Sequence, residues 1–415
     1  MSGAETSPLA GRLTLKVGTG AAARSVGTVI GAEIGRDLRD VAGYFDLQLF
    51  DGGRAAAAMP QSAQPGASVA AIQQGAPCQL AIDGEPVLVG YIDVAEGEWR
   101  ADRLQAHVRG RDRTGDLVDC AATPNGPAEF RHVDLLHIAG AICAPFGIRV
   151  VAQTEIGAPF ERLAIGPHET AMVAIEKAAR QRAVLLVSDG VGGLLLTTGG
   201  RSAAPGNLIV GQGVLGARYR YDWTRRFSDV FVKGQAEKAA GRRGSAPALT
   251  HATAPLANGV APSLPADAEA TEGAGILMVG HAVDPAMTRW RPSVRMTRTQ
   301  SGMSSVQVQA EWWVRVLRGE STLLSYTVPD WRGPNGSLWR PNQVVRVFDP
   351  YGGVDEPMLI RKVIFRLGDD GARTEIEVVG LTAFDRINEA QRRAPLRAKY
   401  APYPNQYTEF PTRPQ

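Results

Sequence analysis

Two long stretches of this chain alternate apolar and polar residues, and a stretch with helical spacing lies between them. In the first stretch, LTLKV (13–17) and YFDLQLFD (44–51) place apolar side chains at every second position. A period of two is typical of strands that bury one face. Because Gly, Pro and Asp interrupt these runs at short intervals, the pattern favours a small barrel or sandwich. A chain of this kind is expected to be rich in β-structure.

The middle stretch changes to a mixed pattern. Residues 133–142 have helical spacing and stop near Pro-Phe-Gly at 145–147, and residues 169–182 predict a second helix. A strand is expected at 148–151, and a hairpin is expected from the apolar runs at 184–187 and 194–197. Together these elements predict a compact α+β domain.

Alternation returns in the last stretch, after residue 207. Strands are predicted at 230–232 and then at LLSYTV, QVVRVFD, KVIFRL and TEIEVVG. The last two runs, joined by GDDGAR, predict a hairpin with Asp369 and Asp370 in its turn. Before these strands, Ser304 or Ser305 is expected to cap a helix that ends at Gly319. An Ala/Pro/Gly-rich segment at 236–271 predicts a long loop.

Length and charge limit the class of protein. A chain of 415 residues suggests two to four domains, and a formal charge of +3 argues against a nucleic-acid binder with a basic face. From residue 386 onward six Lys or Arg stand against two Glu, so the C-terminal arm is basic. No signal peptide and no apolar run of membrane-spanning length is found, so we expect a soluble protein made in a cytoplasm.

The segment GQGVLG at 211–216 matches the dinucleotide-binding fingerprint, yet we expect it to be a turn. The fingerprint needs its third glycine to open a helix whose N-terminus holds the pyrophosphate. Here residues 217–223 alternate with a period of two and favour a strand. The glycines are therefore interpreted as turn residues with positive φ.

The histidines and cysteines between residues 107 and 143 lack the spacing of metal ligands. Cys120, His132, His137 and Cys143 form no CxxC or HxxxH pair. His132 and His137 are separated by about 140° around a helix, so they do not share a face. We expect no metal and no cofactor.

Paired carboxylates are the remaining enzymatic signal, because glycosidases use two of them. Asp112, Asp116 and Asp119 are one candidate group, and the Asp369–Asp370 pair is another. The first group is expected to pair with Arg109, Arg111 and Arg113. Such pairing lowers a carboxyl pKa, whereas a general acid needs a raised one. We therefore expect no catalytic residues.

Two segments combine aromatic and basic residues. Tyr219, Tyr221 and Trp223 alternate with arginines, as in platforms that stack single-stranded nucleic acid, and Trp312 and Trp313 are adjacent. We interpret Trp313 as part of an apolar helix stripe. The Arg–Tyr alternation is expected to turn one face inward and the other toward solvent or a partner.

The C-terminal arm is either disordered or a docking segment, and the sequence leaves both open. Large aromatic side chains between prolines give contact area at low entropy cost. The residues predicted to contact a partner are Arg397, Lys399, Tyr400, Tyr403 and Tyr407.

Read in order, several segments resemble the baseplate hub proteins of Mu-type contractile phages, a family related to late control D proteins. The segments are HVRGRDRTGDLVDCAA (107–122), the block 169–200, RFSDVFVKGQ (226–235), DPAMTRWRPSVRM (284–296), QVQAEWWVRVLRGES (307–321) and the ending 338–387. The similarity covers roughly residues 10–390, and the loop 236–271 lies outside it.

The resemblance implies a non-enzymatic structural protein of the virion tail baseplate, assembled in the bacterial cytoplasm. It implies a fold of two tube-like β-barrel modules around an α+β domain, assembled as a homotrimeric ring. The ring would adapt the sixfold tail tube to the threefold central spike and form part of the DNA channel. The implied partners are further copies of the chain, the spike protein, a tail tube or distal tail protein, and baseplate wedge proteins. Neither membrane anchoring nor lasting DNA binding is implied.

On this plan the chain divides into six parts. They are a first β-barrel module (10–96), an α+β domain (97–204), a second β-barrel module (205–235 and 320–388), the flexible loop (236–271), a helix-containing connecting segment (272–319) and the basic arm (389–415). Two other functions stay open from the sequence: a tail-associated peptidoglycan hydrolase, and the hub of a tail-like bacterial injection system.

Overall fold

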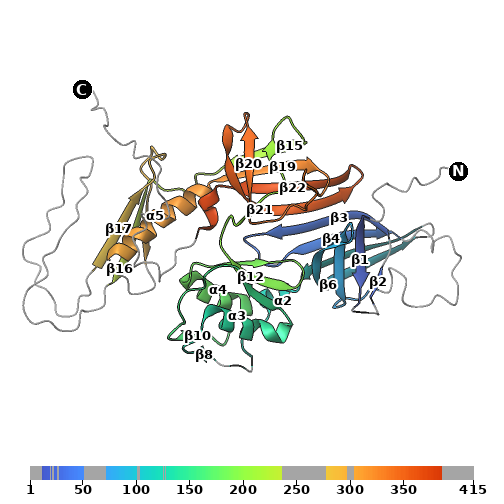
Figure 1. The fold of residues 1–415 in the computed structure, drawn as a ribbon, viewed down its shortest axis with the longest axis horizontal. Helices are drawn as coiled ribbons and strands as arrows, with labels where there is room; N and C mark the ends of the chain where they lie inside the picture. Colours follow the sequence, from blue (N-terminus) through green and yellow to red (C-terminus); the bar gives the residue numbers. More distant parts are fainter. Residues whose placement is uncertain are drawn as a thin grey trace, which may run out of the picture. The chain divides into compact units, whose positions relative to one another are not determined.

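The computed structural model describes residues 12–18, 20, 23–25, 28–50, 72–100, 103–124, 126, 128–235, 277–296 and 303–385. The chain divides into two compact units, Met1–Arg226 with Arg315–Gln415 and Phe227–Val314, and each is described by itself. Strands far outnumber helices (Figure 1), so the β-rich fold class predicted from the sequence is confirmed. Among the described residues no helix is both long and apolar enough to cross a membrane.

The first module is an antiparallel sheet that curls toward closure. Its strands are β1 (Leu13–Val17), β2 (Arg24–Ser25), β3 (Thr28–Asp37), β4 (Tyr44–Phe50), β5 (Pro77–Ile82), β6 (Glu85–Arg100) and β7 (Arg103–Asp112). They lie in the order β3-β4-β7-β6-β5-β1, and β1 contacts β3. Phe45, Leu47 and Leu49 are buried, as their alternation predicts. By its pairing, β7 lies in this sheet, beyond the expected boundary at residue 96.

The α+β domain follows β7 and has its own apolar core. Its elements are α2 (Gly115–Asp119), β8 (Glu129–Phe130), α3 (Leu135–Cys143), η3 (Ala144–Phe146), β9 (Arg149–Ala152), β10 (Leu163–Ala164), α4 (Ala171–Gln181), β11 (Leu185–Ser188) and β12 (Gly193–Thr197). Asp134 and Thr170 cap α3 and α4 by accepting backbone N–H bonds. Both predicted helices and the β11–β12 hairpin are therefore present, and β9 pairs with β12 in parallel.

The second module carries the strands predicted near the C-terminus. Its elements are β13 (Ser202–Ala203), β14 (Leu208–Ile209), β15 (Gly216–Tyr221), β19 (Thr322–Pro329), β20 (Gln343–Asp349), β21 (Val354–Gly368), β22 (Gly371–Val379) and η4 (Leu381–Phe384). Gly368 pairs with Gly371, which leaves Asp369 and Asp370 as the two turn residues of the predicted hairpin. The strand order β15-β19-β22-β21 places β15 at an edge.

The unit Phe227–Val314 is a three-stranded sheet with a helix on one face. Central β16 (Asp229–Gln235) pairs with β17 (Leu277–Val283) and with β18 (Pro292–Met296), and α5 (Met303–Glu320) begins in this unit. We expected β16 to join the second module, and this was wrong because both of its partners lie in this unit.

The helix α5 also corrects a prediction. Ser304 and Ser305 lie within the helix instead of capping it, and the helix runs to Glu320, one residue beyond Gly319. Gly319 is helical, and the missing side chain leaves room for η4, since an added Cβ would lie 2.6 Å from the Ala383 nitrogen. The apolar stripe predicted to include Val306, Ala310, Trp313, Val314 and Leu317 is partly confirmed. Val306, Ala310 and Leu317 are buried, whereas Trp313 and Val314 are half-buried.

Candidate functional site

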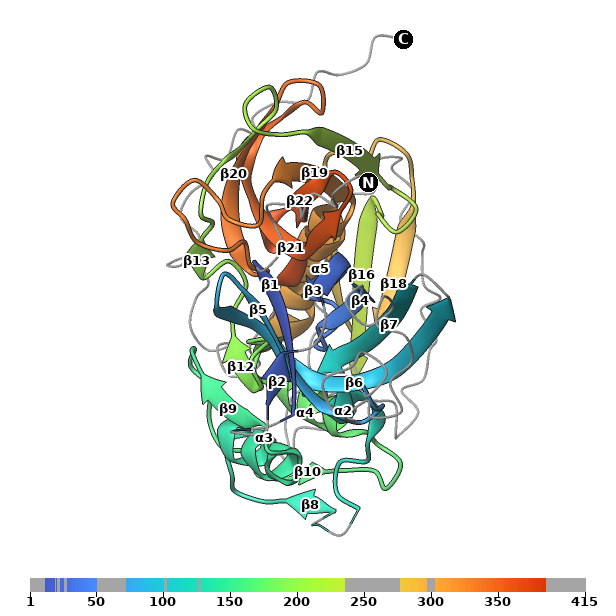
Figure 2. The same ribbon diagram turned by 90° about the vertical axis from the view of Figure 1, so that its right-hand side faces the viewer.

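The two β modules share one continuous fourteen-stranded sheet, joined where β3 pairs with β21. The pairing is antiparallel and runs from Asp37 opposite Lys362 to Ala32 opposite Leu367. The strand β21 is long enough to pair with β20 over its first half and with β3 over its second. Figure 2 shows β3 and β21 side by side at this junction. Because the β3–β21 ladder crosses the junction, the two modules are parts of one sheet.

Ion pairs reinforce the junction on its buried side. Arg361 is 9% exposed, and its guanidinium contacts the Asp37 carboxylate at 3.1 Å and the Glu377 carboxylate. Asp37 belongs to β3 and Glu377 to β22, so one guanidinium joins three strands of the sheet. A charge removed from water in this way is stabilising only with its partners in place.

A second arginine reinforces the more exposed side of the junction. Arg366 on β21 bonds Glu375 on β22 at 2.9 Å and also pairs with Glu33 on β3. The Tyr44 hydroxyl donates to Glu33 at 2.7 Å, and burial raises the pKa of Tyr44 above its usual value. The sequence analysis missed both arginines. In the hairpin register Arg366 faces Arg373, and Arg361 lies at a register shift, so neither arginine stands directly opposite its carboxylate.

A third set of ion pairs joins the β5–β6 hairpin to the segment before β20. Arg332 contacts Asp83 and Glu85, both at 3.1 Å, while Arg340 contacts Glu85 at 2.7 Å. Arg12 also bonds Asp83, at 2.9 Å, and this hydrogen bond lowers the pKa of the Asp83 carboxyl. The two modules are thus held together at a second place, outside the strand ladder.

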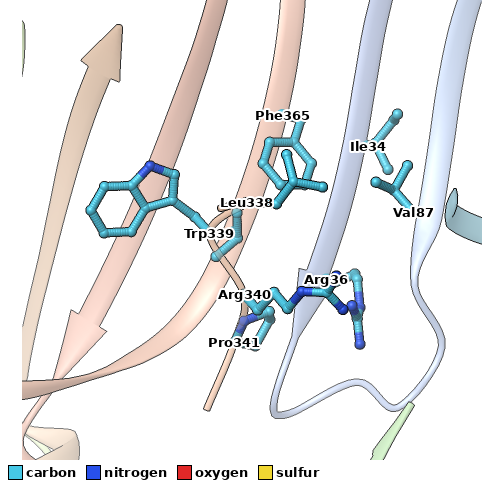
Figure 3. A pocket seen from close by; sticks show the side chains of 9 residues that line it. Ile34, Arg36, Val87, Leu338, Trp339, Arg340, Pro341 and Phe365 are labelled. Carbon is cyan, nitrogen blue, oxygen red and sulfur yellow. The ribbon is translucent and has the colours of Figure 1, made fainter. Parts of the chain in front are cut away.

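A small cavity lies beside the junction (Figure 3). Its walls are apolar, and Arg36 and Arg340 lie side by side at one end. The Arg36 guanidinium donates to the Ser188 carbonyl, and burial lowers the pKa of Arg36. The cavity volume is about 10 Å³, roughly that of one water-sized sphere. This space is too small for a cofactor or substrate.

Asp112 ties the end of β7 to the α+β domain. Its carboxylate is 2% exposed and accepts bonds from the Gly43 N–H at 3.0 Å, the Thr114 N–H at 2.9 Å and the Ser188 hydroxyl at 2.7 Å. We expected Asp112 to pair with a neighbouring arginine, and the structure corrects this. Backbone N–H groups and hydroxyls hold it because the strand end leaves those donors free of ladder bonds.

The other two carboxylates of this group behave differently from each other. Asp119 pairs with Arg111 at 2.6 Å, and that hydrogen bond lowers its pKa, as predicted. Asp116 was expected to have a lowered pKa, but burial raises it. A raised pKa is one property of a general acid, yet Asp116 lies on a one-turn helix and does not line the cavity of Figure 3.

The remaining motifs take structural roles. Gly211 and Gly213 have φ of 96° and 71°, and strand β15 follows them, so the glycine-rich segment is the predicted turn. His132, with φ of 53°, precedes α3, whereas His137 lies within it. No group of three or more possible metal-binding side chains occurs among the residues that the structure describes.

The alternation of β15 is only partly as predicted. Its two tyrosines turn toward the module, but all six residues of the strand are exposed. Tyr219 and Tyr221 donate hydroxyl bonds to Asp349, at 3.2 Å, and to the Gly352 carbonyl. These bonds hold β15 against the β20–β21 turn while leaving its outer edge open.

Some predicted residues cannot be placed. The arm residues Arg397, Lys399, Tyr400, Tyr403 and Tyr407 and the loop 236–271 lie outside the described residues. The arm therefore stays a prediction.

Comparison with protein families gives three matches along the chain. Residues 30–112 match the N-terminal domain of Mu phage baseplate assembly protein GpP-like proteins. Residues 114–198 match the second domain of gp44-like baseplate hub proteins. Residues 288–387 match the fourth domain of Mu phage baseplate assembly protein GpP.

Individual relatives agree with these matches. The chain is 28% identical over 355 residues to the baseplate hub protein gp44 of Escherichia phage Mu, which covers 84% of this chain and 83% of the relative. The 43 kDa tail protein of prophage MuSo2 from Shewanella oneidensis has a TM-score of 0.70 and 29% identity, covering 90% of this chain and 99% of the other. A tail protein from Neisseria meningitidis MC58 shares the fold, with a TM-score of 0.67, 20% identity and the same two coverages.

Proposed function

Because this chain is a homologue of the Mu-type baseplate hub proteins, we propose that it is the baseplate hub of a phage tail and that it works as a trimeric ring. The observation that carries this proposal is the β3–β21 junction, which joins two β modules of one chain in a single sheet. Three such chains present six similar modules around one axis. A closed trimer of this kind can meet a sixfold partner on one side and a threefold partner on the other.

The ring is proposed to adapt the sixfold tail tube to the threefold central spike and to form part of the DNA channel. A formal charge of +3 over 415 residues suits that role, because a strongly basic lumen would retain DNA by its phosphates. The basic arm 389–415 is proposed as a contact for another baseplate protein, through Arg397, Lys399 and the tyrosines that follow.

A scaffold role without catalysis fits how the polar groups are used. Asp112 is surrounded by structural donors, the junction carboxylates pair with arginines, and the cavity at the junction has room for about one water. A cell-wall hydrolysis assay with the purified protein tests this directly, and turnover of peptidoglycan would contradict the scaffold role.

Electron microscopy of the purified protein tests the proposed ring. We expect top views with threefold symmetry in which six similar lobes surround a central opening. Particles that contain a single chain, even when the tail tube protein is added, would overturn the proposal. Removing residues 389–415 is expected to leave the ring intact while weakening the binding of baseplate partners.

A further inference from the structure

The outer edge of β15 carries basic side chains, and no strand among the described residues pairs with it. Asp222 directs its N–H to the carbonyl of Ser321, the residue before β19, at 2.8 Å. Backbone N–H and C=O groups alternate in direction along an antiparallel strand. The N–H and C=O groups of Ala217, Tyr219 and Tyr221 therefore point away from β19. Arg218 and Arg220 occupy the strand positions between these three residues, and both arginines are exposed. Such an edge is a template for another strand.

A second open edge lies in the first module, along the far half of β6. This strand pairs with β5 from Glu85 to Tyr91, and Ile92 bonds the residues just before β5. From Asp93 onward β6 still pairs with β7, but no described strand pairs with its other edge. Glu96 and Glu98 are exposed on this part, and the Glu96 side chain keeps 61% of its surface exposed while it pairs with Arg109.

The two edges are comparable in length and opposite in charge. The strand β15 has six residues, and the open part of β6, Asp93–Arg100, is long enough to pair with all of them. Arginines at two alternate positions on β15 would face glutamates at two alternate positions on β6. Opposite charges at facing positions stabilise a strand pair, whereas two copies of β15 would place arginine against arginine. Pairing of β15 with an acidic edge is therefore favoured over pairing of two β15 strands with each other.

One chain does not bring its own two edges together. In the sheet order, β15 and β6 are separated by the strands β19, β22, β21, β3, β4 and β7. Figures 1 and 2 both show β15 and β6 well apart within this unit. The acidic edge that β15 meets must therefore come from another molecule.

We propose that β15 of one subunit pairs with the open part of β6 of a neighbouring subunit, so that the sheet continues from chain to chain. The inference rests on the proposed ring and names the contact that closes it. Each subunit uses a basic edge on one side and an acidic edge on the other. Such a head-to-tail contact closes into a ring when the rotation per subunit fits.

Charge reversal with rescue tests the pairing. The variants are E96K/E98K, R218E/R220E and the combination of all four substitutions, with R346E/R373E as a control on exposed arginines away from the edge. Light scattering over a concentration series gives the oligomer mass, and thermal melting verifies that each variant is folded. Each edge variant is expected to need at least about tenfold more protein to assemble, and the fourfold variant is expected to recover.

A covalent test avoids any dependence on charge. Gly97 and Ala217 are exposed, and an added Cβ at Gly97 meets no atom within 4 Å. In a C120S background, which removes the exposed thiol, G97C/A217C treated with a short bis-maleimide is expected to give covalent dimers and trimers. G97C alone and A217C alone are expected to stay as single chains on a denaturing gel.

The outcomes separate the edge pairing from the ring. An oligomeric wild type whose two edge variants also stay oligomeric would overturn the pairing and leave the ring standing. Loss of assembly in both edge variants without recovery in the fourfold variant would also overturn it. A wild type that forms no ring under any condition would remove the proposed ring and the edge pairing together.

Discussion

The two β modules share one sheet, yet their interiors differ. The first is filled by aliphatic and aromatic side chains, such as Leu15, Phe45 and Leu88. The buried polar groups of the first module, such as Asp112, lie at its border with the α+β domain, whereas the second buries polar groups among its own strands and turns. The Tyr326 hydroxyl bonds the Asp349 carboxylate at 2.9 Å, and the Trp331 indole N–H bonds the Arg366 carbonyl at 3.0 Å.

The polar groups of the second module hold its turns in place. Asp349 also accepts the N–H groups of Tyr351 and Gly352, at 3.0 and 2.8 Å, and the hydroxyl of Tyr219 on β15. The first module instead is built by its antiparallel strand ladder, which brings β1 back near β3 without pairing the two strands. The two modules are thus held together differently. The first depends on its strand ladder, and the second holds an exposed edge strand through hydrogen bonds to the buried Asp349.

The largest effect is expected where the two modules meet. Replacing Arg361 by Met removes a buried guanidinium from the half-buried carboxylates of Asp37 and Glu377, and the expected loss is about 3 kcal/mol of unfolding free energy. R373A removes an exposed pair with Asp370 and is expected to change stability by less than about 0.5 kcal/mol. Urea unfolding measures the unfolding free energy of both variants. Equal losses in the two would contradict a stabilising role for the Arg361 ion pairs at the junction.

The next effect concerns ladder closure in the first module. An added Cβ at Gly90 would lie 1.9 Å from the Arg111 carbonyl oxygen, so G90A forces β6 and β7 apart and is expected to cost about 2 kcal/mol. Gly97 lies on the same strand with no atom within 4 Å of an added Cβ, and G97A is the matched control. Thermal melting of G90A and G97A compares the two losses of stability, and G90A is expected to lose more. A G97A loss as large as that of G90A would contradict the close approach.

A smaller effect is expected from the buried hydrogen bonds of the second module. Y326F leaves one oxygen of the buried Asp349 carboxylate without its hydroxyl donor and is expected to cost about 1.5 kcal/mol. Y219F removes a bond to the same carboxylate from an exposed side chain and should cost clearly less. Chemical denaturation of the two single variants tests this, and a larger loss for Y219F would reverse the account of the second module.

The smallest effects are expected from pH, and they differ in sign. Arg12 holds the pKa of Asp83 below its unfolded value, so this carboxylate stabilises the fold at neutral pH. That contribution is lost as the pH falls through the lowered pKa. The difference between wild type and D83N, a few tenths of a kcal/mol at this partly exposed site, should therefore vanish in acid.

The pH dependence of the Asp116 contribution to stability has the opposite sign, because burial raises the pKa of this carboxyl. Its ionised form weakens the folded state at neutral pH, and that cost disappears as the pH falls and the group is protonated. D116N is expected to be neutral or slightly stabilising at pH 7. Stability curves of both variants from pH 3 to 8 test the pair, and a destabilised D116N at pH 7 would contradict the assignment.

Local elements could be read from the sequence because their signals are local. The β21–β22 hairpin follows from two alternating runs around a two-residue turn, and α3 and α4 follow from helical spacing after the capping residues Asp134 and Thr170. The pairing of β3 with β21 could not be read, because alternation identifies a strand but not its distant partner. The candidate site is built around that pairing, so most of the site could not be predicted from the sequence.

Two incorrect predictions share one cause. The Arg–Tyr alternation of β15 was taken for a half-buried strand, and β16 was assigned to the second module. In both cases the pattern of the strand was recognised correctly. Its exposure and its partners depend on which other strands lie next to it, and that is decided by the whole fold.

The central claim is that two β modules joined in one sheet let three chains form a closed ring. Its most direct test is the mass of the wild-type protein in solution, by light scattering behind a sizing column. The account predicts a species near three times 44.2 kDa. A single-chain mass that persists at high protein concentration, and in the presence of the tail tube and spike proteins, would contradict it.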